Sequence, residues 1–449
     1  MSAEVRTSSA PAARTGRLRS VFGGYALAAT LAGAAAAASP GFLKAQGLRQ
    51  EAAAAEARGD YAAAEAALEK ALELRASHPG IILALAGVEA RQGKAGEALT
   101  HLQQFVTMGL AANLGETDAF ASLRYNPQFI GVLAGIARNT NPVGHPEIAA
   151  HLGDGRALFE GLAIDPESGR IFASSVRQRR IVVVEGGAAR DFVPPGAEGL
   201  WSVFGLAIDA PRGLLWAASA AGPQSEGVAP AEYGAAGVFA FDLQTGALKR
   251  KAVLGPDAKA AFGDLAVAPD GTVYVSDSNG ALYRLPPASQ TLEPFAPDVR
   301  YVSPQGLAVV ADGRVLMVAD YAMGLFSIDT GTQTVTRLTA ASGVTLLGLD
   351  GLAGTGPLIA TQNGVAPQRV LRLEIGSEWD DVLSVEVLSA NAPFHHEITL
   401  GAIWDGGFWY VANSQWDRFG PDGQVLGETP FAETVVARIA LPPPDAPAE

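Results

Sequence analysis

One short apolar segment returns six times in the later two thirds of the chain, and its spacing limits the folds open to the sequence. The first copy runs Glu160-Gly161-Leu162-Ala163-Ile164-Asp165. The position of its glycine falls at residues 161, 205, 264, 306, 351 and 401, with Asp264 in place of glycine in the third copy. Successive copies therefore stand 44, 59, 42, 45 and 50 residues apart. Four-stranded propeller blades recur at this period. The repeat therefore predicts an all-β six-bladed propeller over residues 146–441.

The residue composition and the spacing of apolar residues change near Pro142. Before it, Ala and Leu recur at helical spacing, whereas after it runs of Val, Ile, Phe and Tyr are separated by Asp-Gly, Ser-Gly and Thr-Gly turns. A length of 449 residues also favours more than one domain. The chain is therefore predicted to be multidomain, with an all-α region at 46–140 followed by the propeller.

The helical region carries two copies of one pattern, offset by 34 residues. The copies consist of a glycine turn and then small and large apolar positions: Gly59-Asp60-Tyr61 with Ala64, Leu68 and Ala71, and Gly93-Lys94-Ala95 with Ala98, Leu102 and Phe105. This resembles the tetratricopeptide consensus. The resemblance implies a concave surface for a peptide or partner protein. A stabilising appendage on the propeller is the alternative, and both interpretations stay open.

The two ends of the chain predict segments outside these domains. Arg14, Arg17 and Arg19 precede a small-residue apolar run at 21–38, which is the pattern of a signal peptide. Residues 1–45 are therefore expected to direct export to the periplasm or the cell exterior. An uncleaved N-terminal membrane anchor is the other interpretation of this segment. The proline-rich residues 442–449 predict a disordered tail.

Composition excludes several functions. The net charge is −14 and the basic residues beyond the N-terminus are scattered, so no basic stripe is present to bind a nucleic acid. The absence of cysteine excludes disulfides and thiolate chemistry. Nucleophile-elbow, phosphate-loop, zinc-protease and EF-hand motifs are also absent.

The residue before each repeated motif should enter the propeller axis from one face, and the loops between second and third strands should emerge on that face. The first set is Glu160, Phe204, Gly263, Gln305, Asp350 and Leu400. The loop set includes residues 177–180, 220–236, 277–279, 320–323, 362–367 and 413–416. Two carboxylates, an amide and a rim of polar and aromatic side chains suit a hard cation or a small polar molecule.

Three segments resemble the senescence-marker/gluconolactonase-like family of six-bladed propellers. They are Glu160-Gly161, Pro304-Gln305-Gly306-Leu307-Ala308 with Val318-Ala319-Asp320, and Asp350-Gly351-Leu352. The resemblance implies a divalent cation, usually calcium, held by a Glu, two Asn and an Asp, with the Asp also acting as general base or nucleophile. Glu160 and Asp350 match the charged ligands. Gly263 replaces one Asn, with Asp264 beside it, and Gln305 replaces the other.

Two functions follow as hypotheses. The first is an exported hydrolase for a lactone or ester, in which Glu160, Asp264, Gln305 and Asp350 surround calcium and Asp350 or His396 activates water. The second is a non-enzymatic scaffold or binding protein in an envelope complex, with a protein partner on the helical repeats. Whether the chain is an enzyme stays open between them.

The sequence also predicts structural roles for residues outside this set. Asp277 and Asp320 are expected to hold propeller loops by bonding to backbone amides. The alternative to a catalytic role for His396 is a position in a surface loop. Residues 434–441 alternate in the manner of a strand, and they are predicted to close the ring beside 147–152, since an open ring would expose sheet edges.

Overall fold

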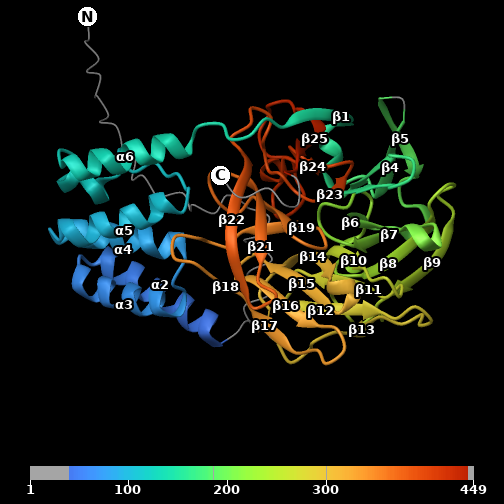
Figure 1. Ribbon diagram of the computed structural model, residues 1–449, viewed down its shortest axis with the longest axis horizontal. Coiled ribbons are helices and arrows are strands. Elements are labelled where there is room, and N and C mark those ends of the chain that lie inside the picture. The colour runs from blue at the N-terminus through green and yellow to red at the C-terminus, as the bar shows by residue number, and fades with distance from the viewer. Residues whose placement is uncertain (1–39, 186, 300, 443–449) are drawn as a thin grey trace, which may run out of the picture.

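The computed structural model describes residues 40–185, 187–299 and 301–442, in which a helical arm precedes six small sheets (Figure 1). The arm comprises α2 (Pro40–Ala57), α3 (Tyr61–Leu74), α4 (Pro79–Arg91), α5 (Ala95–Thr107), the short 3₁₀ helix η1 (Asp118–Leu123) and α6 (Pro127–Asn139). Helix α2 begins before residue 46, so the arm includes residues that the sequence assigns to the targeting segment. The rest of that segment and the predicted tail lie outside the described residues.

Local sequence accounts for the boundaries of the helices. The Asp60 side chain accepts the Ala63 N–H at 3.1 Å and caps α3, and Asn126 accepts the Gln128 N–H at 2.8 Å and caps α6. Gly59 ends the turn after α2 with a φ of 76°, a left-handed value that favours glycine. The small residues Ala64 and Ala71 are fully buried, which lets neighbouring helices pack closely.

Six sheets follow the arm, each with an inner strand at the axis. Blade 1 holds β2 (Phe159–Ile164), β3 (Ile171–Ser175), β4 (Arg180–Glu185) and β5 (Ala188–Val193). Blade 2 holds β6 (Ser202–Asp209), β7 (Leu214–Ala220), β8 (Ala236–Asp242) and β9 (Leu248–Val253). Blade 3 holds β10 (Phe262–Val267), β11 (Val273–Asp277), β12 (Ala281–Leu285) and β13 (Glu293–Pro294).

The remaining blades follow the same antiparallel order. Blade 4 holds β14 (Pro304–Val310), β15 (Val315–Asp320), β16 (Gly324–Asp329) and β17 (Val335–Arg337). Blade 5 holds β19 (Leu349–Ala353), β20 (Leu358–Gln362), β21 (Arg369–Ile375) and β22 (Asp381–Ala390), and β18 (Thr339–Ala340) pairs parallel to β22. Blade 6 holds β23 (Gly401–Trp404), β24 (Gly407–Val411), β25 (Glu433–Ala440) and β1 (Glu147–Asp154). The prediction of six blades is confirmed.

The ring closes through the two ends of the propeller sequence. Strand β1 pairs antiparallel with β25, with Glu147 opposite Arg438 and Asp154 opposite Glu433. The predicted closing strand is therefore confirmed, and blade 6 consists of three C-terminal strands and one N-terminal strand.

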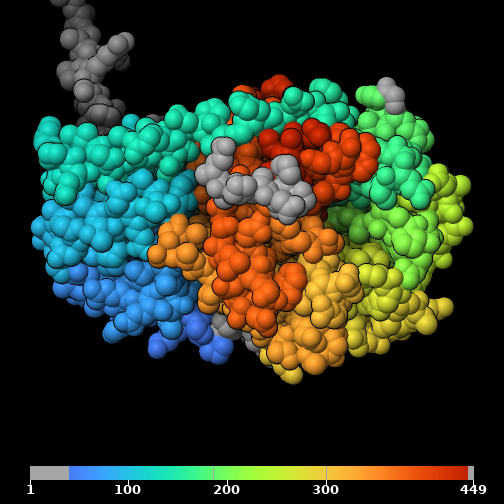
Figure 2. Space-filling model, in the orientation of Figure 1, coloured from blue at the N-terminus to red at the C-terminus, as the bar shows by residue number. Residues whose placement is uncertain are grey.

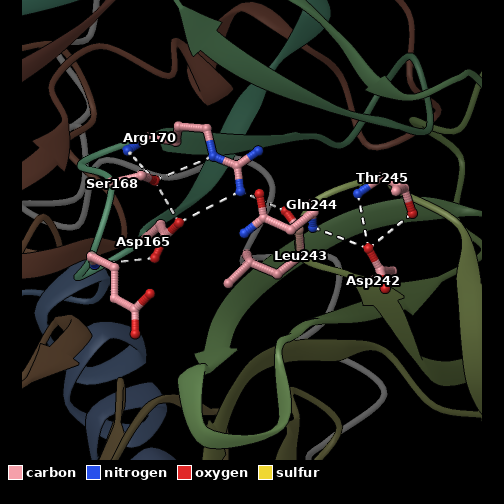
Figure 3. A network of polar contacts seen from close by, with 8 residues as sticks. Asp165, Ser168, Arg170, Asp242, Leu243, Gln244 and Thr245 are labelled. Carbon is pink, nitrogen blue, oxygen red and sulfur yellow. Dashed lines mark hydrogen bonds and ion pairs between the residues drawn. The ribbon is translucent and has the colours of Figure 1, made fainter.

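A polar network joins blades 1 and 2 at the end of β2 that lies away from Glu160 (Figure 3). Arg170 Nη2 donates to the Leu243 carbonyl oxygen at 2.7 Å and lies 3.5 Å from Asp165 Oδ2. Asp242 Oδ1 accepts the backbone N–H and the hydroxyl of Thr245, both at 2.9 Å. The network attaches the inner strand of blade 1 to the β8–β9 turn of blade 2.

The helical arm packs directly on the propeller, and Figure 2 shows its blue and cyan surface against the orange surface of blade 5. Phe42 of α2 is buried in a cluster with Tyr301 and Phe326. The Ala111 N–H, beyond α5, donates to the Ala366 carbonyl oxygen at 2.7 Å. Within the part of the chain that the structure describes, no helix combines the length and apolar character needed to cross a membrane.

Candidate functional site at the propeller axis

A β-bulge interrupts the inner strand at the repeated motif and turns side chains toward the axis. In blade 1, Phe159 pairs with Ser175 and Leu162 with Ala173, so Glu160 and Gly161 together oppose Ser174 alone. The same irregularity occurs in β6, β10, β14 and β19. The Gly161 N–H, which lacks a ladder partner, donates to Ser174 Oγ at 2.7 Å. Bulges of this kind re-aim side chains and are common beside active sites.

The glycine of the motif is required by the close approach of neighbouring inner strands. A Cβ on Gly161 would lie 2.1 Å from the Phe204 carbonyl oxygen, and one on Gly306 would lie 2.5 Å from the Asp350 carbonyl oxygen. Gly205 leaves room for the Asp264 carboxylate, whose Oδ1 would lie 2.4 Å from a Cβ there. The recurrence of glycine thus reflects crowding at the axis.

All six residues that precede the motifs line one cavity of about 400 Å³. Loops add further polar and aromatic lining side chains, chief among them Tyr233, Asn279, Tyr321, Asn363, Glu397 and Trp416. No Arg, Lys or His lines this cavity among the described residues. The site therefore gathers carboxyl groups without a basic side chain to neutralise them.

Glu160 is buried at the cavity wall and bonded to the loop of blade 6. Trp416 Nε1 donates to Glu160 Oε2 at 2.5 Å, and the Trp416 ring stacks on Phe204 with centroids 6.5 Å apart. Burial raises the pKa of Glu160 well above its usual range, and the negative charge of Asp350 adds to this rise. The Trp416 hydrogen bond opposes it, but the protonated form is favoured when no cation is present.

Asp350 is held by an amide from the loop after β20. Asn363 Nδ2 donates to Asp350 Oδ2 at 2.7 Å and to the Ile398 carbonyl oxygen at 2.8 Å. Burial raises the pKa of Asp350 to about 7, against the opposing effect of the Asn363 hydrogen bond. Asn363 Oδ1 is buried and has no hydrogen-bond partner among the described residues. A buried amide oxygen without a donor is costly, so Asn363 carries an unsatisfied acceptor beside Asp350.

A third acidic group, Glu397, lies beside this pair at the mouth of blade 6. Burial raises the pKa of Glu397 to about 7, and the charge of Asp417 adds to the rise. Its backbone N–H donates to Gln368 Oε1 at 2.8 Å. The sequence places this residue beside His395 and His396 but gives no signal that its carboxyl enters the cavity.

The helical arm supports the loop that carries Asn363. Arg369 Nη1 donates to the Met108 carbonyl oxygen at 2.8 Å, while its Nε and Nη2 donate to Gln362 Oε1 at 2.9 and 2.7 Å. Gln362 Nε2 in turn donates to the Leu347 carbonyl oxygen at 2.8 Å. The buried Arg369 therefore connects α5 to the residue that precedes Asn363.

The two remaining predicted ligands, Asp264 and Gln305, also line the cavity, and each bonds to other groups of the protein. Asp264 Oδ2 accepts the Leu307 N–H of blade 4 at 3.0 Å, and burial raises the pKa of Asp264 to about 7 despite this bond. Gln305 Nε2 donates to Ser303 Oγ at 2.9 Å. Its Oε1 would lie 3.3 Å from a Cβ placed on Gly263. The longer Gln305 thus fills the room left by Gly263.

His396 lies outside the cavity lining. Its Nε2 is 2.9 Å from Asp417 Oδ1, both side chains are exposed, and Asp417 raises the pKa of His396. Asp320 accepts four backbone N–H groups, and Asp277 accepts those of Ala261 and Asn279 at 2.8 and 3.0 Å. The structural role predicted for these two aspartates is confirmed.

The oxygen atoms at the axis form a partial set for a hard cation. Across residues 40–442, masked positions aside, no group of three or more His, Asp or Glu side chains is arranged to hold a metal. Calcium also accepts amide and water oxygens. Glu160, Asp350 and Asn363 line this cavity, as do the predicted Asp264 and Gln305, and they offer oxygen atoms of the kind that a calcium ion with water ligands would use.

Comparison with known proteins gives similarity of structure only. No known protein family matches the chain, and no curated protein matches it. A glucose dehydrogenase has a TM-score of 0.45 and 15% identity, covering 66% of this chain and all of its own. The calcium-binding protein regucalcin from Agrobacterium tumefaciens has a TM-score of 0.44 and 15% identity, and the match covers 66% of this chain and 94% of that protein. Virginiamycin B lyase from Staphylococcus aureus has a TM-score of 0.41 and 13% identity, and the match covers 59% of this chain and 81% of that protein. The six-bladed architecture itself rests on the six sheets described above.

Proposed function

We propose that the propeller is a divalent-cation-dependent hydrolase for a small lactone or ester. The observation that carries the proposal is the convergence of Glu160, Asp350 and Asn363 in one cavity that no basic side chain lines among the described residues. Calcium bound there would polarise the substrate carbonyl and bring the carboxyl groups to their charged form.

The side chains of the chain itself account for the rest of the reaction. Asp350, brought to its charged form by the cation, would accept a proton from the attacking water. The carbonyl carbon gains the water oxygen, its bond to the ring or ester oxygen breaks, and the proton passes to that leaving oxygen. The stacked Phe204 and Trp416 form an apolar wall that holds the substrate against the carboxyl groups.

The test combines calcium titration with a screen of lactones and aryl esters in calcium and in chelator. The parent should bind calcium at micromolar to millimolar concentration and hydrolyse at least one substrate only in its presence. Glu160→Gln and Asp350→Asn should abolish both properties, while His396→Asn, outside the cavity, should retain them. A parent that takes up no divalent cation at millimolar concentration rules out this mechanism.

A protein-binding role for the arm is a second candidate, and one observation favours it. Helices α3 and α5 begin at Tyr61 and Ala95, which reproduces the 34-residue tetratricopeptide spacing, and Tyr125 and Ile130 are 93% and 55% exposed at the outer end of the arm. Such side chains are common anchors for partners. Cross-linking of the parent and a Tyr125→Ser, Ile130→Ser variant tests this role, since a partner that both proteins capture equally does not use this surface.

We also propose export through the N-terminal segment, because Arg14, Arg17 and Arg19 precede its apolar run. Cell fractionation with N-terminal sequencing of the mature protein tests both export and cleavage. Recovery of full-length protein in the cytoplasm alone would contradict the proposal.

A further inference from the structure

A second cavity, of about 320 Å³, lies at the seam between the arm and the propeller. Its arm side is formed by the turn between α3 and α4, with Arg75, Ser77 and His78. Its propeller side is formed by blade 4 and the segment after it, with Arg337 and Thr339. Two arginines from different domains therefore face one space.

Arg75 is buried, with 6% of its surface exposed, and lies over the Phe42 ring at 5.2 Å. A guanidinium has five N–H donors, and Arg75 Nη2 donates to the Ala322 carbonyl oxygen. The side chain of Arg75 also lines the cavity. In the described part of the chain no carboxylate lies within ion-pair distance of Arg75.

Asp320 supplies the negative charge that acts on Arg75, but its oxygens are occupied. They accept the backbone N–H groups of Val302, Ser303, Ala322 and Met323 at 2.6 to 3.1 Å. Asp320 therefore attracts Arg75 through space without making an ion pair with it.

Positive charge is in excess around the cavity. Arg337 Nε donates to the Met323 carbonyl oxygen at 2.9 Å, and Arg49 of α2 also acts on Arg75. Arg49, Arg75 and Arg337 stand against Asp320 and the cavity-lining Glu73, which leaves one positive charge (3 − 2) in a chain whose net charge is −14. Burial keeps the pKa of His78 well below its usual range, so His78 adds no charge.

We propose that this seam cavity binds a small oxyanion, a phosphate or carboxylate group, between Arg75 and Arg337. The planar forks of two guanidinium groups match such oxygens, and the Ser77 and Thr339 hydroxyls provide further donors. Asp320 acts on the buried Arg75 only through space, so a bound anion would supply the direct ion pair that this guanidinium lacks among the described residues. Because the two arginines belong to different domains, the bound anion also holds the arm on the propeller.

Calorimetric titration of the full chain with inorganic phosphate, in chelator and at constant ionic strength, tests the proposal. One saturable site is expected, with a rise in Tm that equal ionic strength of sodium chloride does not reproduce. The exposed Arg337 can be changed without disturbing the core, and Arg337→Gln should weaken phosphate binding about tenfold or more, the effect of one charge-assisted hydrogen bond. Arg75→Lys keeps the charge but loses the fork, and should weaken binding as well.

Arg124→Gln, an equal loss of charge at an exposed arm position outside the cavity, is the control and should bind as the parent does. Titration with malonate in place of phosphate identifies the source, since the better ligand shows which oxyanion chemistry the cavity prefers. The proposal is overturned if neither anion gives a saturable signal. It is equally overturned if Arg337→Gln and Arg75→Lys both bind phosphate as tightly as the parent.

Discussion

Substituting Asp350→Asn should have opposite effects on stability in chelator and in calcium. A carboxyl group whose pKa is raised in the folded chain binds its proton more tightly there than in the unfolded chain. The stability that comes from this difference is present below pH 3.8, the ordinary pKa, and is lost as the pH rises through about 7. Metal-free parent protein should therefore lose stability between pH 4 and pH 8, and Asp350→Asn should lose less.

The size of the effect follows from the pKa of Asp350. A rise from 3.8 to about 7 corresponds to about 4 kcal/mol, at about 1.36 kcal/mol for each pH unit. In a domain of this size about 1 kcal/mol changes Tm by roughly 2 °C, so Asp350→Asn should melt up to about 8 °C above the parent at pH 8 in chelator. At pH 4 the parent group is already protonated, and the two proteins should melt together.

Calcium should reverse the order, because a ligand that binds only the folded state stabilises it by mass action and Asp350→Asn removes a carboxylate ligand. The assay is a set of thermal melts at pH 4 and pH 8, each with chelator and with calcium. Asp257→Asn removes one exposed negative charge outside the cavity and controls for net charge. An Asp350→Asn protein that melts no higher than the parent at pH 8 in chelator would refute the reasoning from burial and repulsion.

Three further predictions concern the closure of the propeller ring, the contact of the arm with blade 5, and His396. Deleting residues 434–449 removes most of β25 and should abolish cooperative unfolding of the propeller in calorimetry, and a melt close to that of the parent would contradict the closure. Arg369→Met leaves Gln362 Oε1 and the Met108 carbonyl oxygen without their donor, so denaturant unfolding should show a loss of about 2–5 kcal/mol; a loss under about 0.5 kcal/mol would show that the connection contributes little. His396→Asn should leave the pH dependence of any calcium-dependent hydrolysis unchanged, and a lost titration step would return His396 to the reaction.

The blades were predictable from sequence because the crowding at the axis favours a glycine at the same position of the repeated motif. A Cβ on Gly161, Gly205 or Gly306 would lie 2.1, 2.4 or 2.5 Å from an atom of the next blade's inner strand, and the spacing of these glycines reveals the period. The bulge was not predicted, and a hydroxyl of the next strand accompanies it in blades 1, 3 and 5 only, since Ala218 and Ala319 stand opposite it in blades 2 and 4. Ser174 and Thr361 accept the N–H groups of Gly161 and Gly351, and such second-strand hydroxyl residues are a signal that could have revealed the bulge in those blades.

The site was predictable to the extent that it depends on the motif. Glu160 and Asp350 line the same cavity, as expected from their equivalent positions in two blades. Asn363 was not identified as a ligand, because the path of its loop is set by contacts with the arm. Its neighbour Gln362 is bonded to Arg369, which reaches Met108 more than 250 positions earlier, and no local pattern reports such a contact.

The pairing of β1 with β25 has a consequence for how the protein is made. Strand β1 ends at Asp154 and its partner begins at Glu433, so 279 residues (433 − 154) must be translated before the two can meet. At roughly 5–20 residues per second, β1 leaves the ribosome about 14–56 s before its partner exists. An unpaired strand is a template for aggregation during that time. Beside the exposed Ile148, β1 bears Glu147, His151 and Asp154, all exposed, and charged and polar side chains of this kind oppose edge-to-edge aggregation until the C-terminal strand has been synthesised.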